Sequence, residues 1–275
     1  MSEFERNSMN IYFADQSFNQ TTCNPYNNNL PYTDDWIMLQ LLETADFKLF
    51  TGRGKEGIFR LIITKETPDW AYRVCDFIEY ESTHGKNMIL AIHKNDYEAA
   101  QSIYDNHSYA DRFLRPYEQK VLVHTTTKEN HVSIMQDGCL KSWNALKKSG
   151  VNAEEAPIGR LLGDPPDYSD YIMFSDGGVF LEIVVASKQK GKIEMDIDSP
   201  YISGARFYFD AERIAENGLL IRDGGHLKVK DCLPIDQYIL WIATPDALGI
   251  SENTTPRIFA EKADSVFAEK FGIAL

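Results

Sequence analysis

The chain has few cysteines, no long apolar run and fewer basic than acidic residues. Its 275 residues include 4 cysteines, which are widely scattered and form no CxxC pair. This spacing is typical of neither a zinc knuckle nor a secreted disulfide framework, so we expect reduced, packed thiols. Because no segment approaches the roughly 18 consecutive apolar residues of a membrane-spanning helix, we expect no membrane partner.

The charge balance limits the classes of partner. The chain carries 28 basic and 41 acidic residues, a formal net charge of −13. Nucleic-acid binding by counterion release needs a basic face, so this balance argues against a general duplex binder and leaves only a local basic cleft open. Residues 1–10 have neither the basic nor the apolar region of a secretory signal, which predicts a cytoplasmic protein. Delivery by a signal-independent secretion system stays an alternative.

What is present is an ordinary globular composition, with 43% apolar and 12% aromatic residues. Residues 1–33 are rich in Asn, Gln, Thr and Ser and predict a weakly ordered leader, with residues 11–13 docking locally. Residues 34–118 predict a small α+β accessory domain. Residues 119–275 are rich in candidate strands, which favours a curved or split antiparallel sheet. The predicted fold class is α+β.

Local patterns predict the individual elements of both domains. In the accessory domain we expect a short helix at 36–42, strands at 47–50, 58–63 and 88–92, and helices at 68–82 and 96–115. In the second domain we expect strands at 121–123, 171–174, 179–185, 206–209, 218–221, 226–229 and 237–242. An amphipathic helix at 256–271 is expected to dock on the sheet.

Gly52, Gly54 and Gly57 form a GxGxxG string. In a dinucleotide-binding fold this string precedes a helix, whose N-terminus meets the phosphate. Here a strand pattern follows at 58–63, and no HRD or DFG string of a protein kinase occurs downstream. The glycines therefore predict a hairpin turn.

The segment 121–127, Val-Leu-Val-His-Thr-Thr-Thr, is a strand pattern that ends in polar side chains. A helical pattern follows at once and closes at Gly138. Such an arrangement presents side chains at a sheet edge beside a ligand pocket. It resembles the first motif of ADP-ribosyltransferases and their RNA phosphotransferase relatives, in which a strand-end histidine precedes a helix. Ile134, Gly138 and Leu140 stand at comparable spacing.

Two later strings follow in the order of that superfamily. Residues 171–181 resemble the strand-turn-strand of poly-ADP-ribose polymerase-like domains, with Tyr171 and Phe180 at its aromatic positions. Residues 233–241 resemble the closing strand. The resemblance covers roughly 120–242. The alternative for residues 171–181 is an ordinary hairpin with core aromatics.

One position departs from the family pattern. Gln237 stands where a transferase carries its catalytic glutamate, and Asp236 beside it would point to the opposite face of the strand. Glutamine keeps the hydrogen bond but supplies no negative charge for a developing oxocarbenium ion. This predicts weak transferase activity, a non-acidic mechanism or a silent pocket. The phosphotransferase branch needs an Arg-x-His pair that is missing from 141–148.

The resemblance implies an ADP-ribosyltransferase-like domain that binds NAD, as substrate, between two split antiparallel sheets. His124 and Thr125 would hold the adenosine ribose and the nicotinamide amide, Tyr171 would stack on the nicotinamide beside Phe180, and Gln237 would contact the nicotinamide ribose. ADP-ribose would pass to water or to a macromolecule, more readily a protein than a nucleic acid. The histidine spacing predicts no metal site. The alternatives are a catalytically silent binding module of the same fold and a hydrolase or nuclease toxin on an unrelated α+β fold.

Overall fold

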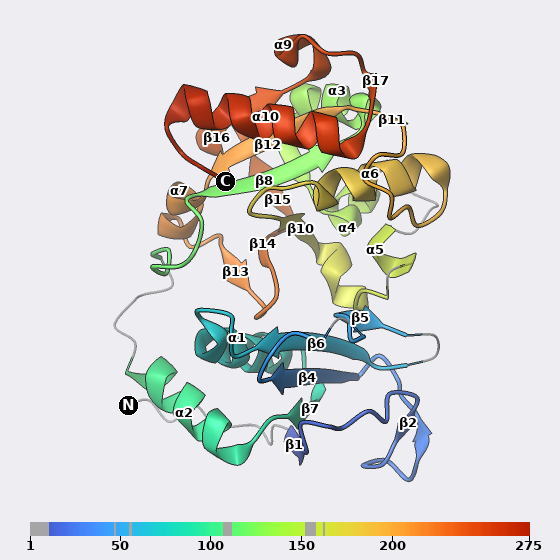
Figure 1. Cartoon of the computed structure of the whole chain (residues 1–275), viewed down its shortest axis with the longest axis vertical. Coiled ribbons are helices and arrows are strands. Elements are labelled where there is room, and N and C mark those ends of the chain that lie inside the picture. Colours follow the sequence, from blue (N-terminus) through green and yellow to red (C-terminus); the bar gives the residue numbers. More distant parts are fainter. Residues whose placement is uncertain (1–10, 47, 55–56, 107–111, 152–157, 162) are drawn as a thin grey trace. The chain divides into compact units, whose positions relative to one another are not determined.

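Parallel strands in the first part of the chain and antiparallel strands in the rest give the protein an α+β architecture, as predicted (Figure 1). The computed structural model describes residues 11–46, 48–54, 57–106, 112–151, 158–161 and 163–275. The chain divides into two units. The first comprises Met1–Ser108, Leu162–Pro166 and Arg222–Gly225, and the second comprises Tyr109–Leu161, Asp167–Ile221 and His226–Leu275.

The first unit contains a sheet in the order β1-β7-β4-β6-β5. The first four strands in this order are parallel, and β5 lies antiparallel at the edge. The helices α1 and α2 pack against one another and complete the unit with a small β2-β3 hairpin. The bounds are β1 (Ile11–Ala14), β2 (Cys23–Asn24), β3 (Leu30–Pro31), β4 (Trp36–Leu42), β5 (Gly52–Arg53), β6 (Phe59–Thr64), α1 (Trp70–Thr83), β7 (Asn87–Ala91) and α2 (Lys94–Asp105).

The helix predicted at 36–42 is wrong, because this segment is the central strand β4. Its apolar residues are buried on both faces of the sheet. Ile37 and Leu39 belong to the core that α1 covers, whereas Trp36 and Met38 belong to a core on the opposite face. A central parallel strand is apolar without alternation, and a short apolar run of this kind has no periodicity that distinguishes it from a helix.

The segment predicted as a leader, 1–33, contains the short strands β1, β2 and β3 in its described part. Residues 1–10 lie outside the described residues, but β1 pairs along its whole length with β7, which confirms the docking expected at 11–13. Tyr12 of β1 and, after this strand, Phe18 and Tyr32 pack on the sheet face around Trp36. The Trp36 ring lies 5.1 Å from the Tyr12 ring. Aromatic burial therefore orders a stretch whose polar composition suggested little order.

The other first-unit predictions differ in outcome. The strands at 58–63 and 88–92 and the helix at 68–82 are confirmed as β6, β7 and α1. The strand expected at 47–50 is wrong for residues 48–50, which the structure describes and which form no strand. The strand in this region is β5, at Gly52–Arg53. The helix expected at 96–115 ends at Asp105. The glycine string leads from β5 into its antiparallel partner β6, as a hairpin requires, with Lys55 and Glu56 outside the described residues.

The second unit contains two three-stranded antiparallel sheets, β16-β12-β8 and β10-β14-β13, and two strand pairs, β15-β9 and β11-β17. Its strands are β8 (Val121–Thr126), β9 (Cys139–Lys141), β10 (Tyr171–Phe174), β11 (Tyr201–Ile202), β12 (Ala205–Asp210), β13 (Ile221–Arg222), β14 (Leu227–Lys230), β15 (Cys232–Pro234), β16 (Ile239–Ala243) and β17 (Asn253–Thr254). Its helices are α3 (Lys128–Asp137), α4 (Trp143–Lys148), α5 (Ile158–Leu161), η1 (Pro166–Asp170), α6 (Phe180–Lys190), α7 (Ala211–Glu216), α8 (Ile235–Tyr238), α9 (Pro245–Leu248) and α10 (Pro256–Phe271).

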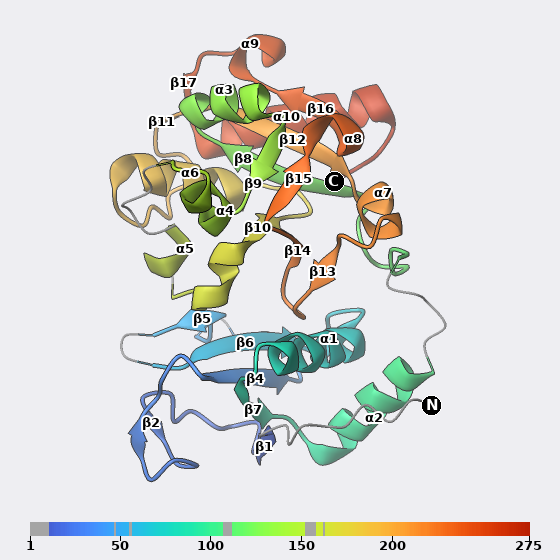
Figure 2. The ribbon, with the colours of Figure 1, turned by 180° about the vertical axis from the view of Figure 1, so that it is seen from behind.

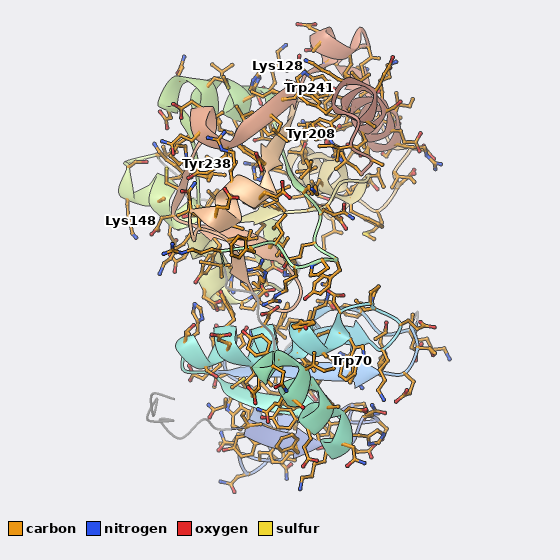
Figure 3. The ribbon with its side chains drawn as sticks, turned by 90° about the vertical axis from the view of Figure 1, so that its left-hand side faces the viewer. Trp70, Lys128, Lys148, Tyr208, Tyr238 and Trp241 are labelled. Carbon is orange, nitrogen blue, oxygen red and sulfur yellow. The ribbon has the colours of Figure 1, made fainter. Side chains whose placement is uncertain are left out.

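Strand β12 is the centre of the first of these sheets and is buried on both faces. Phe207 and Phe209 point into a core shared with β10, β14, α7 and α8. Tyr208 points into a second core, which α6 and α10 cover (Figure 1). There its ring stacks on Trp241 of β16 and on Phe267 of α10, with centroids 5.5 and 4.3 Å away (Figure 3). The helix α3 and the β15-β9 pair lie on the other side of the sheet (Figure 2).

The strand predicted at 179–185 is wrong, because this segment opens helix α6. Its valines and isoleucine favour a strand by propensity, but the buried residues Glu182, Ile183, Val185 and Ala186 form one helical face against β8 and α10. Tertiary packing overrides the propensity. The strand predicted at 237–242 starts later, at Ile239, as β16. Of the strand predicted at 218–221, only Ile221 belongs to a strand, the short β13 (Ile221–Arg222).

Helix ends marked by capping residues agree with the sequence. The helix predicted at 256–271 is α10 with the same bounds, capped by the Thr255 side chain. Helix α3 begins after Thr127, whose hydroxyl accepts a hydrogen bond from Asn130 N, and ends at Gly138 in the left-handed conformation. Among the helices of the described part of the chain, none has the length and apolar character needed to cross a bilayer.

Gly204 should be intolerant of any side chain. A Cβ added there would lie 2.1 Å from Thr126 O and 2.5 Å from Thr127 C, which are backbone atoms at the end of β8. We expect Gly204→Ala to lower the free energy of unfolding by about 3 kcal/mol in urea denaturation. The reason is that the start of β12 must move away from the end of β8 to make room for the methyl group. Gly54→Ala is the control, since a Cβ there meets nothing within 4 Å. Equal denaturation midpoints for both variants would contradict this account.

Candidate functional site

The polar end of β8 lies where the two three-stranded sheets of the second unit meet. A single antiparallel bridge joins β8 to β10, with Val123 N donating to Ser175 O at 2.8 Å and Ser175 N donating to Val123 O at 3.0 Å. Beyond this bridge the two strands pair with different partners, β8 with β12 and β10 with β14. His124, the next residue of β8, therefore stands at the split.

The imidazole of His124 makes a further contact between β8 and β10, next to the backbone bridge. Its Nδ1 lies 3.1 Å from Met173 O, and its ring meets the Phe174 ring edge-on at 6.0 Å. A carbonyl oxygen can only accept, so the neutral ring carries its hydrogen on Nδ1 and keeps a lone pair on Nε2. Burial lowers the pKa of His124, against the opposing effect of the Met173 bond. The ring is therefore neutral at neutral pH and offers an acceptor.

Aromatic rings surround this face of β8. Phe207 lies opposite His124 in the β8-β12 register. His131 of α3 packs edge-on against Phe207 at 5.7 Å, and burial lowers its pKa as well. Two neutral imidazoles and two phenylalanines therefore share one side of the sheet.

Thr125 points to the other face of β8 and into a different environment. Its hydroxyl donates to Glu182 Oε1 at 2.7 Å. The same carboxylate accepts from Arg206 Nη1 at 3.2 Å and, through Oε2, from the Tyr201 hydroxyl at 2.7 Å. Arg206 and Glu182 are fully buried. Thr125, Tyr201 and Arg206 all donate to this carboxylate, which matches an ionised side chain.

Asp264 of α10 completes this network. It accepts from Arg206 Nε and Nη2, both at 2.9 Å, and from the Tyr208 hydroxyl at 2.8 Å. It also accepts from Gly178 N, while Arg206 Nη2 donates to Gly178 O at 3.0 Å. The network joins β8, β12, α6, α10 and the turn after β10. We call Arg206, Glu182, Asp264, Tyr201 and Tyr208 the arginine cluster.

Burial sets the electrostatics of the arginine cluster. It raises the pKa of Glu182, and the Arg206 guanidinium and the Thr125 and Tyr201 hydroxyls act against that rise. Burial alone would lower the pKa of Arg206, but Glu182 and Asp264 more than offset it and raise that pKa. The pKa of Tyr201 is raised by burial and then by Glu182, so its phenol keeps its proton and its role as donor. The cluster is satisfied internally, which indicates a structural role.

The aromatic residues predicted for the site do not gather around His124. Tyr171 lies on the opposite face of β10 from Phe174, and Lys228 Nζ stands 4.8 Å from its ring centroid. Phe180 is 72% exposed at the start of α6. Gln237 is exposed in the short helix α8 rather than on a strand. His124 and Thr125 are neighbours along β8, with side chains on opposite faces.

Sequence analysis did not identify the arginine cluster. Its members are separated by 24 residues between Glu182 and Arg206 and by 58 between Arg206 and Asp264. The one available signal is Arg206 itself, a charge inside the apolar strand pattern Ala-Arg-Phe-Tyr-Phe. Within the described ranges, no group of three or more His, Cys, Asp or Glu side chains is arranged to hold a metal ion.

Comparisons of the chain with protein-family models, with curated proteins and with solved structures found no match in any of the three.

The arginine cluster should be essential for stability. Arg206→Met leaves Glu182 buried without its cation, and we expect the free energy of unfolding to fall by about 3–5 kcal/mol. The matched control is Arg257→Met, which breaks a two-contact pair with Asp198 in which both side chains are about half exposed. Exposed pairs contribute about 1 kcal/mol or less. Similar urea midpoints for the two variants would contradict the structural role, and so would failure of Glu182→Met to recover stability in the Arg206→Met background.

The lowered pKa of His124 should appear as a pH dependence of stability. The unfolded imidazole, with a pKa near 6.5, binds a proton more readily than the folded one. Its contribution is therefore complete above about pH 6.5 and is lost as pH falls through the lower folded value. We expect the urea midpoint to fall between about pH 7.5 and about pH 5.5, and to fall less in His124→Gln. The control is His93→Gln, at an exposed histidine, and its urea midpoint should fall with pH as that of the wild type does. If the fall were reduced equally in this control, it could not be assigned to His124.

Proposed function

We propose that the second unit binds NAD at the split between its two sheets and acts as an ADP-ribosyltransferase-like protein, with ADP-ribose passing to a protein or to water. One observation carries this proposal. The histidine of the first motif lies inside β8, next to the single bridge beyond which the strands of two antiparallel sheets take different partners. A split between antiparallel sheets is the arrangement that the motif resemblance implied.

The chemistry of His124 supports a contact to a ribose. Because Nδ1 donates to Met173 O, the neutral ring can accept a hydrogen bond at Nε2. A ribose hydroxyl is a suitable donor for this atom. The lowered pKa keeps the ring in the accepting form across the neutral range.

The catalytic part of the proposal has weaker support than the binding part. Gln237 supplies no negative charge, and it is exposed in α8. The carboxylate that contacts the polar end of β8 is Glu182, and it accepts from Thr125, Tyr201 and Arg206. These two observations favour the second candidate, a module of the same kind that binds NAD and leaves its glycosidic bond intact.

Titration calorimetry with NAD tests the binding step. We expect heat of binding with the wild-type chain and about tenfold weaker affinity for His124→Ala, the effect of losing one hydrogen bond to a neutral group. His93→Ala, an exposed change in the first unit, is the control and should bind as wild type. Absence of heat with wild-type protein would overturn the proposal.

A nicotinamide-release assay separates the two candidates. Release by wild-type protein, reduced in His124→Ala, supports an active transferase or NAD hydrolase. Binding without release supports the silent module. In that case Gln237→Glu supplies the missing carboxylate, and release gained by this change would identify Gln237 as a residue of the pocket.

A further inference from the structure

Two cysteines that are far apart in the sequence meet on one strand pair of the second unit. Strand β15 pairs antiparallel with β9, so that Leu233 lies opposite Leu140. Cys139 and Cys232 occupy diagonal positions of this pair, with their sulfur atoms 2.7 Å apart. The scattered cysteines, with no CxxC pair, predicted reduced, packed thiols, and 93 residues separate these two. The fold brings them into direct contact.

The surroundings of the two sulfurs allow them to react. Cys232 is exposed and Cys139 is half-buried, so a small oxidant reaches them from solvent. The ammonium group of Lys141 lies close enough to act on the charge of both sulfurs. Partial burial and the neighbouring Cys139 raise the pKa of Cys232 to about 12, which keeps this thiol protonated at neutral pH. Thiolate is the reactive form, so Cys232 is the poorer of the two nucleophiles and acts as the thiol that the other sulfur links to.

We propose that Cys139 and Cys232 form a reversible disulfide, and that this strand pair is an oxidant-responsive modification site. With a peroxide as oxidant, one thiol becomes a sulfenic acid and releases one water. The second sulfur then displaces hydroxide from the sulfenic acid, which leaves as a second water, and the S–S bond forms. In total the two thiols lose two electrons and two protons, and hydrogen peroxide is reduced to two waters.

The position of the pair explains why the bond would be reversible. In a disulfide the sulfurs are about 2.05 Å apart, so they must approach one another further than the present 2.7 Å. Because Cys232 is exposed, a reductant in solvent reaches the bond, and exposed disulfides are among the readily reduced ones.

The bond would also fasten two neighbouring segments. Cys139 directly follows Gly138, the end of α3, and Pro234 of β15 directly precedes α8. One backbone hydrogen bond already joins these segments, from Ile235 N to Gly138 O at 2.9 Å. A covalent link beside it closes a long loop and restricts the unfolded chain. This site is independent of the proposed NAD binding.

Thiol labelling of the full chain tests the proposal. The chain is treated with hydrogen peroxide in small excess, then unfolded and labelled with a maleimide before intact-mass measurement. Of the 4 cysteines, we expect labels on Cys23 and Cys75 only, and all 4 labelled after dithiothreitol. A peptide digest without reductant should contain Cys139 linked to Cys232.

Matched variants identify the partners. Cys23→Ser, which removes an exposed cysteine of the first unit, should keep the link, whereas Cys139→Ser and Cys232→Ser should each lose it. The oxidised wild-type chain should unfold at a temperature about 5 °C higher than the reduced chain, with no such rise in Cys139→Ser. Labelling of all four thiols after peroxide, a link between two chains, or oxidation of Cys232 to the sulfonic acid without a link would overturn the proposal.

Discussion

The second unit depends on the charge of one buried guanidinium. Arg206 is the second residue of β12, where both faces of the strand are covered, and a cation there is stable only beside its carboxylates. Glu182 comes from α6 and Asp264 from α10, so both helices must dock on the same face of the sheet before the charge is compensated. The hydrophobic core on this face excludes water, and the arginine cluster determines which surfaces of the two helices face inward.

The two polar residues His124 and Thr125 of β8 therefore lie in different environments. Thr125 lies on the same face as Arg206 and gives its hydroxyl to Glu182, whereas His124 lies on the opposite face beside Phe174. The alternation of a strand separates adjacent side chains in this way. Two adjacent residues of one sequence motif therefore have different roles: Thr125 donates to a member of the arginine cluster, and His124 lies at the split between the sheets.

The parts of the fold that the sequence predicts are those specified by local chemistry. The helix Pro256–Phe271 has a threonine cap, a proline in its first turn and a final glycine, and its bounds were predicted as observed. The segment Phe180–Lys190 has a final glycine but no capping side chain at its start, and Trp36–Leu42 is a short, mostly apolar run. Each adopted the other type of element. Their conformation is decided by burial against partners far along the chain. The same holds for the site: the strand leading to His124 was predictable, although it continues to Thr126, but the partners of Arg206 and the meeting of Cys139 with Cys232 were not.

The arginine cluster also limits the chemistry available at the split. If Glu182 were to act as a catalytic base, it would have to give up donors that now satisfy it, and Arg206 would lose part of the negative charge that stabilises it. Catalysis by this carboxylate would therefore weaken the packing of α6 on the sheet. Since Thr125 is committed to the same network, the ligand contact proposed at this end of β8 falls to His124, whose Nδ1 is bonded to Met173 O and whose Nε2 carries the lone pair. A neutral acceptor of this kind orients a bound hydroxyl without supplying charge, and for this reason binding is the better supported half of the proposed function.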